Sequence, residues 1–142
     1  MFTHEHQLRV RYAETDQMGY VYYGNYAAYY EVARVEALRN IGFSYKEMEA
    51  NGIMMPVLEN HSRFLLPGKY DELLTIRVIL KDMPGVRIRF HYEIYSEDGE
   101  LIHTGETLLT FLKTDNHKPC RPPQKFMALI RPYFEPSAKA SM

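Results

Sequence analysis

One stretch of the chain, residues 12–34 (YAETDQMGYVYYGNYAAYYEVAR), concentrates side chains that can do chemistry. Asp16 supplies a carboxylate, which can attack a carbonyl carbon or take a proton from an attacking water molecule. Gly24 and Asn25 stand directly before a run with helical spacing. The first turn of a helix has unpaired N–H groups and roughly half a positive charge, which stabilise an oxygen that becomes negative. Residues of these types at this spacing are the ones that hydrolytic attack on a carbonyl group needs.

Three acidic residues compete for the role of the attacking carboxylate. Asp16 can instead end a strand in an Asx turn, because aspartate is a common turn residue. Glu14 lies two residues away and can substitute for it. Glu31 lies inside the predicted helix, where its spacing to Arg34 favours a surface ion pair. On the residue types alone, the turn role of Asp16 is favoured.

The tyrosines of this stretch divide into two groups. Those at helical spacing are expected to pack against a sheet: Tyr26, Tyr29 and Tyr30. Those before the helix are candidates for lining a substrate pocket: Tyr20, Tyr22 and Tyr23. Asn25 has two interpretations, the N-cap of the helix and a substrate contact, and the cap is favoured.

A long helix and a short one are predicted around the stretch. Residues 13–24 are interpreted as a loop. A helix of about four to five turns is expected from Asn25, with Gly42 just past its C-terminus. The shorter helix has Ser44 as its N-cap and Gly52 as its stop.

Most of the remaining chain predicts antiparallel sheet. Side chains alternate between apolar and polar in residues 7–12, 72–81 and 86–95, and residues 101–113 form the return strand of a hairpin turned by Asp98-Gly99. An interrupted extended segment covers residues 53–67. The side chains expected on the apolar face include Leu8, Val10, Tyr12, Leu74, Ile76, Val78, Leu80, Val86, Ile88, Phe90, Tyr92 and Ile94.

The apolar face of this sheet needs a cover, which the long helix can supply. Strands joined by short turns pair in antiparallel fashion. We therefore expect an α+β fold, with a curved antiparallel sheet wrapped around one long helix, and a further short helix from Pro123.

Bulk composition narrows the class of protein. A chain of 142 residues has a common size for one domain, so a single domain over residues 1–142 is expected. Lys and Arg number 17 against 18 Asp and Glu, and this balance argues against a nucleic-acid partner. Neither a long apolar run nor a signal segment is present, so we expect a cytoplasmic protein with no membrane partner.

The other reactive side chains form no recognised site. The histidines lack metal-ligand spacing and Cys120 is the one cysteine, so neither a metal site nor an organic cofactor is expected. His91 and His103 can meet across a hairpin, where a surface pair is favoured. The absence of a G-x-S-x-G sequence excludes the nucleophile elbow of α/β-hydrolases.

Two motifs, in this order, resemble the hotdog-fold acyl-CoA thioesterases related to 4-hydroxybenzoyl-CoA thioesterase. The first is RVRYAETDQMGYVYYGNYAAYYEVAR, in which an Asp, a Gly three residues on and an Asn-Tyr pair match the family pattern: Asp16, Gly19, Asn25 and Tyr26. The second is LPGKYDELLTI, residues 66–76. The hairpin strands follow in the family's order, and the similarity covers roughly residues 7–113.

The resemblance implies a hotdog fold and hydrolysis of a thioester to a free acid and coenzyme A. It implies that Asp16 is the catalytic aspartate, as nucleophile or general base, and that backbone amides around Tyr23 and Gly24 bind the thioester oxygen. The active site would lie between subunits of a homodimer or homotetramer. The substrate contacts expected beside these groups are Tyr20, Tyr22, Asn25, Arg87 and Arg89.

Related functions remain open on the sequence. Relatives often have a Lys/Arg pair with a nearby Ser where this chain has Met83-Pro84-Gly85-Val86, so an acyl carrier protein can replace coenzyme A as the carrier. A hotdog hydratase or dehydratase wants an Asp-His pair, and no histidine stands between His6 and His61, which disfavours it. A non-catalytic acyl-binding module is the third hypothesis, since it needs the pocket but not Asp16.

Overall fold

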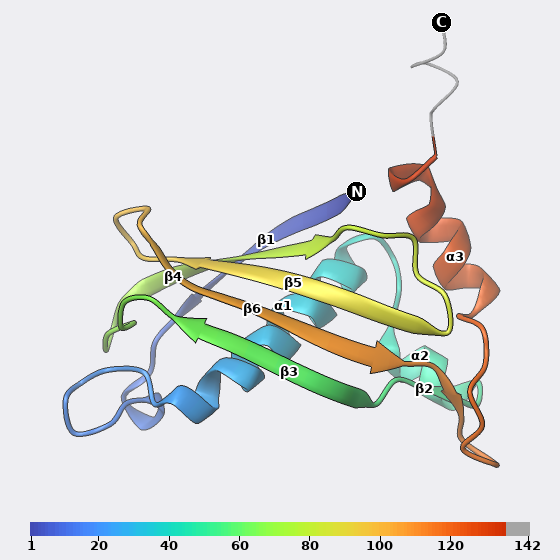
Figure 1. The fold of residues 1–142 in the computed structure, drawn as a ribbon, viewed down its shortest axis with the longest axis horizontal. Helices are drawn as coiled ribbons and strands as arrows, with labels where there is room; N and C mark the ends of the chain where they lie inside the picture. The colour runs from blue at the N-terminus through green and yellow to red at the C-terminus, as the bar shows by residue number, and fades with distance from the viewer. Residues whose placement is uncertain (136–142) are drawn as a thin grey trace, which may run out of the picture.

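The computed structural model describes residues 1–135 and shows a curved five-stranded antiparallel sheet wrapped around one long helix (Figure 1). The sheet order is β1-β4-β5-β6-β3, with strands β1 (Phe2–Arg9), β3 (Val57–Phe64), β4 (Leu73–Leu80), β5 (Arg87–Tyr95) and β6 (Leu101–Thr110). The long helix is α1 (Tyr26–Asn40). The predicted α+β fold class is confirmed.

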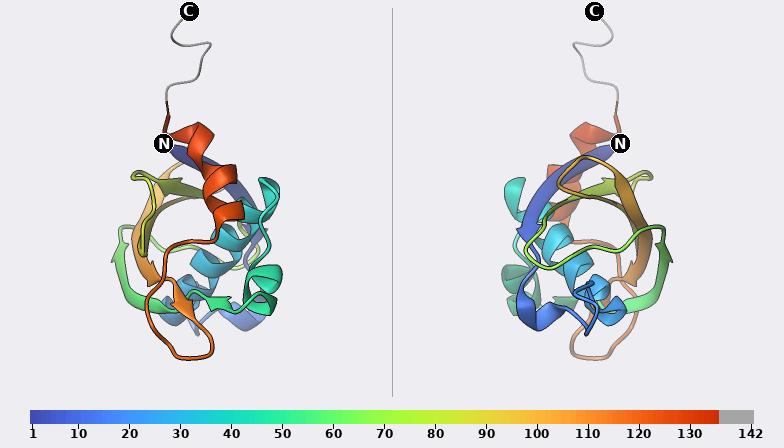
Figure 2. Two further views of the ribbon diagram at one scale, coloured as in Figure 1. Left: turned by 90° about the vertical axis from the view of Figure 1, so that its right-hand side faces the viewer. Right: turned by 90° about the vertical axis from the view of Figure 1, so that its left-hand side faces the viewer.

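Shorter elements complete the fold. They are β2 (Ile53–Met54), which pairs with β7 (Leu112–Lys113), the helices α2 (Tyr45–Ala50) and α3 (Gln124–Ile130), and the 3-10 turns Tyr12–Glu14, Tyr23–Asn25 and Arg131–Tyr133. Figure 2 shows the sheet end-on as it curls around α1, with α3 near the N-terminus of β1. The α3 helix starts after Pro123, as predicted. No helix within residues 1–135 is long and apolar enough to cross a membrane.

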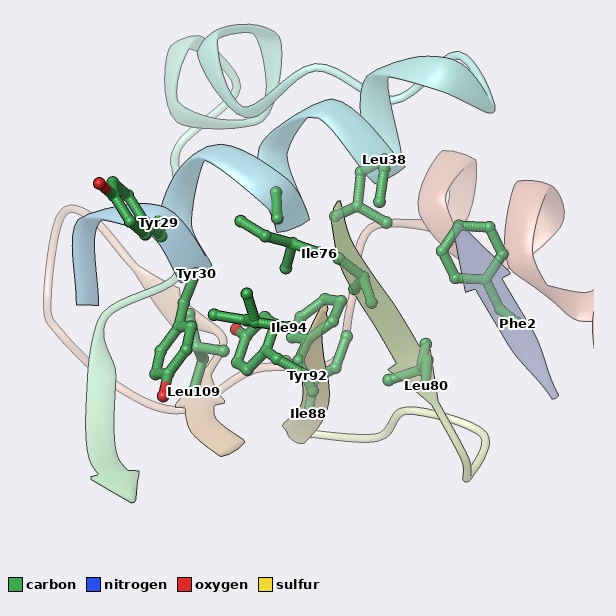
Figure 3. Packing of buried hydrophobic residues seen from close by; sticks show 14 of the residues in the cluster. Phe2, Tyr29, Tyr30, Leu38, Ile76, Leu80, Ile88, Tyr92, Ile94 and Leu109 are labelled. Atoms are coloured by element: carbon green, nitrogen blue, oxygen red, sulfur yellow. The ribbon is translucent and has the colours of Figure 1, made fainter. Parts of the chain in front are cut away.

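Alternation along β4 and β5 produces much of the core (Figure 3). The inward side chains of β4 and β5 are at most 2% exposed: Leu74, Ile76, Val78, Leu80, Ile88, Phe90, Tyr92 and Ile94. The α1 helix covers them with Tyr29, Tyr30, Ala33, Ala37 and Leu38. Each large apolar side chain buried in this way contributes about 1.5–3 kcal/mol, so the sheet holds α1 in a fixed place.

The sequence predictions are wrong at the borders of two strands. β1 begins at Phe2 rather than at residue 7, and it ends at Arg9. Tyr12 lies beyond it in a 3-10 turn and is 78% exposed, because the chain has already left the sheet. Val86 precedes β5 and is 39% exposed rather than inward.

A buried arginine is the second departure from the sequence predictions. Arg34 was expected to pair with Glu31 on the helix surface, but it is only 6% exposed. Its guanidinium donates to the hydroxyl of Tyr92 at 3.3 Å. The helix face that packs on the sheet is therefore wider than the apolar stripe in the sequence.

The ends of α1 lie where the sequence places them, but Asn25 does not act as expected. Gly42 follows the helix with φ of +96°, a conformation that favours glycine. Asn25 occupies the N-cap position, yet its backbone is helical and its side chain makes no capping bond. The reason is the 3-10 turn Tyr23–Asn25, which leads straight into α1. The side chain of Asn25 is thus available for another partner.

A polar cluster lies beneath the first turns of α1. The Tyr30 hydroxyl is hydrogen-bonded to Oγ of Ser62 at 2.7 Å and to Nε2 of His103. His103 is fully buried, and its ring stacks on that of Tyr26 with centroids 4.1 Å apart. Burial disfavours the charged imidazolium and lowers the pKa of His103 to about 4. The expected surface pair of His91 and His103 is wrong, because His103 faces inward and His91 faces outward.

Replacing Gly105 with alanine is expected to destabilise the fold by roughly 1–3 kcal/mol. A Cβ at this position would overlap the Tyr30 hydroxyl and would lie 3.1 Å from the carbonyl oxygen of His61. Tyr30 is fully buried and cannot move aside without repacking. Urea denaturation measures the effect, with Gly85→Ala as the control, since a Cβ there meets nothing within 4 Å. Equal stability of Gly105→Ala and wild type would contradict this packing.

Candidate active site

Asp16 lies in the turn of a short hairpin between β1 and α1. Its N–H donates to the Tyr20 carbonyl at 2.9 Å, and Gly19 closes the turn with φ of +76°. Its Oδ1 accepts the N–H of Met18 at 2.9 Å and that of Tyr20 at 3.2 Å. The Asx turn weighed from the sequence is therefore present. It occupies one carboxylate oxygen, and Oδ2 has no hydrogen-bond partner within residues 1–135.

A hollow of about 530 Å³ opens beside Asp16. Two aromatic rings, Tyr12 and Tyr70, line it and meet edge-on with centroids 5.6 Å apart. Sequence reasoning missed both: Tyr12 was assigned to the core, and Tyr70 comes from the loop between β3 and β4. The one signal for Tyr70 is the motif LPGKYDELLTI, in which it stands.

The start of α1 presents two free backbone amides. Tyr23 and Gly24 form the 3-10 turn with Asn25, and among the described residues neither N–H has an acceptor. The Asn25 N–H is already used, because it donates to the Tyr22 carbonyl at 2.9 Å. The rings of Tyr22 and Tyr23 lie 4.7 Å apart and are 48% and 67% exposed. The amide pair is thus open to a ligand.

Glu14 connects the hairpin that holds Asp16 to the start of α1. On the sequence alone it ranked only as a substitute for Asp16. Its carboxylate accepts the Arg11 N–H at 2.8 Å and the Tyr29 hydroxyl at 3.1 Å, and it pairs with the Arg11 guanidinium at 3.2 Å. Burial disfavours its charge, but these hydrogen bonds outweigh burial and lower the pKa of Glu14. Both of its oxygens have hydrogen-bond partners within the fold, so Glu14 is a poorer candidate for the attacking carboxylate than Asp16.

The structure brings some of the predicted site residues together and leaves others apart. The hairpin and the helix start hold Asp16, Tyr20 and the segment 22–25 on one continuous loop. Arg87 and Arg89 lie instead on the outer face of β5, where Arg89 pairs with Glu106 at 3.1 Å. Both arginines line a separate hollow of about 260 Å³.

A further hollow, of about 560 Å³, lies on the outer face of the sheet. Polar and charged side chains from three strands line it, among them Arg63, His91 and Glu106. It shares no lining residue with the hollow beside Asp16. Hollow size therefore does not single out one of these hollows as the site.

Comparison with known proteins relates this arrangement to one family. The sequence pattern of the Thioesterase-like superfamily matches residues 10–130. The putative acyl-CoA thioesterase YneP of Bacillus subtilis is 37% identical over 101 residues, which cover 71% of this chain and 73% of that protein. The acyl-CoA thioester hydrolase YbgC of Escherichia coli is 30% identical over 121 residues, covering 85% of this chain and 90% of the relative.

Solved structures agree with the sequence relatives. The DHNA-CoA thioesterase of Staphylococcus aureus superposes with a TM-score of 0.82 at 36% identity, and the match covers 94% of this chain and 85% of that one. The predicted hotdog fold is thereby confirmed. The matched residues 10–130 include the second quoted motif and all of the first except Arg9. The chain therefore belongs to the thioesterase-like superfamily of hotdog-fold thioester hydrolases.

Proposed function

We propose that the protein hydrolyses acyl-CoA thioesters, with Asp16 acting beside the backbone amides of Tyr23 and Gly24. One observation carries the proposal: a single loop presents a carboxylate oxygen and two amides that have no hydrogen-bond partner in the part of the chain that the structure describes. The relatives that are named acyl-CoA thioesterases support the substrate class.

The proposed reaction adds water to the carbonyl carbon and breaks the C–S bond. As a general base, Oδ2 of Asp16 takes a proton from water while the amides of Tyr23 and Gly24 hold the developing oxyanion. The tetrahedral intermediate then expels the thiolate, which takes the proton back from Asp16. As a nucleophile, Oδ2 itself attacks the carbonyl and expels the thiolate, which leaves a mixed anhydride. Water then hydrolyses the anhydride, which releases the acid and regenerates the Asp16 carboxylate, and the released proton goes to the thiolate. Both routes require an ionised Asp16.

A second copy of the chain is proposed to complete the site. Every residue of the edge strand β3 is exposed. Several large apolar side chains on or just after it are 44–55% exposed: Val57, Leu58, Phe64, Leu65 and Leu66. An edge of this kind carries unpaired backbone groups and apolar surface, and pairing it with the same strand of a second copy around a two-fold axis covers both.

The remaining substrate contacts are proposed by position. Tyr20 and Tyr22 precede the free amides along the loop and are proposed to meet the acyl group. Arg87 and Arg89 border their own hollow on the outer face of β5 and are proposed to meet the phosphates of coenzyme A. The alternative carrier is an acyl carrier protein.

Free-thiol release from short, medium, long and aromatic acyl-CoAs tests the proposal, and light scattering on the same sample tests the dimer. We expect turnover of at least one ester by a dimer or tetramer. If the protein is inactive on every CoA ester but hydrolyses an acyl carrier protein ester, the carrier is an acyl carrier protein rather than coenzyme A. Inactivity on both, with retained ligand binding, would favour the non-catalytic acyl-binding module. A monomer would contradict the shared site.

A further inference from the structure

One backbone oxygen holds both ends of the segment that carries the free amides. The carbonyl oxygen of Glu14 accepts the N–H of Tyr22 at 2.9 Å and the side-chain amide Nδ2 of Asn25 at 2.8 Å. Tyr23 and Gly24 lie between these two residues in sequence. The segment is thus closed into a small loop on a single atom, and its two amides are fixed relative to that atom.

The side chain of Glu14 attaches this loop to the body of α1. Its Oε1 accepts the hydroxyl of Tyr29, which is only 2% exposed and lies in the first turn of the helix. The same oxygen accepts the N–H of Arg11, at the exit from β1. Glu14 therefore joins the sheet, the hairpin and the helix at one residue, and its side chain is only 17% exposed.

The same residue also fixes the candidate carboxylate. Asp16 stands two residues after Glu14, on the strand of the hairpin that pairs with Tyr20 and Tyr22. A shift of the Glu14 backbone would move Asp16 and the amide segment relative to each other. Oxyanion donors work only within about 2.7–3.1 Å of the developing charge, and misplacement by about 1 Å can cost roughly 100-fold in rate.

We infer that Glu14, Asn25 and Tyr29 are positioning residues, which hold the amides of Tyr23 and Gly24 in register with Asp16. The inference rests on the proposed function of those groups. In this account Asn25 does not cap the helix and does not need to touch the substrate: its side chain closes the amide loop on the Glu14 carbonyl.

Asn25→Asp is the most informative variant. It keeps the size of the side chain, removes the N–H donor and sets a carboxylate against a carbonyl oxygen. The variant loses the 2.8 Å bond to Glu14, but a negative charge at the N-terminus of α1 favours the helix and offsets part of that loss, so the melting temperature is expected to fall only slightly. We expect kcat on a CoA ester turned over by wild type to fall roughly 10- to 100-fold, with KM unchanged within about twofold.

A pH profile separates positioning from a purely structural role. The ordinary pKa of an aspartate carboxyl is about 3.9, so as pH falls from 7 to 4 a growing fraction of the introduced carboxyl is protonated and can again donate to the Glu14 carbonyl. The ratio of the kcat of Asn25→Asp to that of wild type is therefore expected to rise toward acid pH. Asn40→Asp makes the same change at the other end of α1, and its ratio is expected to stay near one throughout.

Tyr29→Phe tests the second attachment with its own control. It keeps the buried ring and removes the 3.1 Å bond to Glu14, and Tyr95→Phe removes a bond of the same 3.1 Å length from Tyr95 to Glu93 on the outer face. We expect kcat to fall for Tyr29→Phe and not for Tyr95→Phe.

Wild-type kcat in both Asn25→Asp and Tyr29→Phe would overturn the inference, as would a loss in Asn25→Asp that shows no recovery toward acid pH. Either result leaves the proposed function standing if Asp16 is still required. Full activity of Asp16→Asn, in contrast, would overturn the proposed function itself, so the two failures are distinguishable.

Discussion

Replacing Asp16 with asparagine is expected to lower kcat for thioester hydrolysis by roughly 10²- to 10⁴-fold, the range typical of a lost general acid or base. The substitution is structurally mild, because the amide oxygen of asparagine can accept the Met18 and Tyr20 N–H groups that Oδ1 accepts now. Only the charge and the free oxygen disappear. Thiol-release kinetics measure the effect, and thermal melting is expected to show an unchanged fold.

Asp115→Asn is the matched control, since it makes the same change at an exposed turn residue away from the hairpin. It is expected to leave kcat unchanged. If Asp16→Asn instead turned over as fast as wild type, Asp16 would be only a turn residue. The two carboxylates left as suspects would then be Glu14 and Glu31.

The stability of the fold is expected to fall by about 3 kcal/mol as pH drops from 6.5 to 4 through His103 alone. In the unfolded chain its pKa is near 6.5, whereas in the folded protein burial lowers the pKa to about 4. Between these values the unfolded state binds the extra proton, so acid favours unfolding. Below pH 4 both states are protonated, and the contribution levels off.

Urea denaturation across this pH range, on wild type and His103→Phe, isolates the effect. Phenylalanine can keep the ring stacked on Tyr26, and the Tyr30 hydroxyl retains Ser62 as a partner. We expect the variant to lose the steep slope between pH 4 and 6.5, while His117→Asn, at an exposed residue, keeps it. Parallel curves for wild type and His103→Phe would show that the imidazole does not titrate in this way.

Periodicity in the sequence was sufficient to predict the architecture. The alternation of Leu74, Ile76, Val78 and Leu80 marks a strand with one buried face, and the structure buries all four. The stop at Gly42 was equally local, since a left-handed residue after a helix favours glycine. Signals of this kind depend only on neighbours in sequence, so they can be recognised without any knowledge of the fold.

Polar residues with distant partners could not be predicted in the same way. Arg34 looks like a surface residue until Tyr92 is placed beneath it, and His103 looks exposed until Tyr30 provides a hydrogen bond. Asn25 has the residue type of an N-cap, but its partner is the carbonyl of Glu14, eleven residues earlier. In each case the deciding contact comes from another element.

In the candidate site, too, residues marked by a local pattern could be predicted, and residues with distant partners could not. Asp16 was predicted because it stands at a motif position, and its Oδ2 has no hydrogen-bond partner among residues 1–135. The role of Glu14 depends on contacts to Arg11 and Tyr29, which only the folded loop creates. The aromatic pair of Tyr12 and Tyr70 joins two loops far apart in sequence, so no local pattern could have predicted it.

The most direct test of the central claim is a crystal structure of Asp16→Asn with an unhydrolysed acyl-CoA that wild type turns over. The account predicts the thioester oxygen within hydrogen-bond distance, about 2.7–3.1 Å, of the N–H groups of Tyr23 and Gly24, with residue 16 facing the carbonyl carbon. A thioester bound elsewhere, such as in the hollow on the outer face of the sheet, would contradict it.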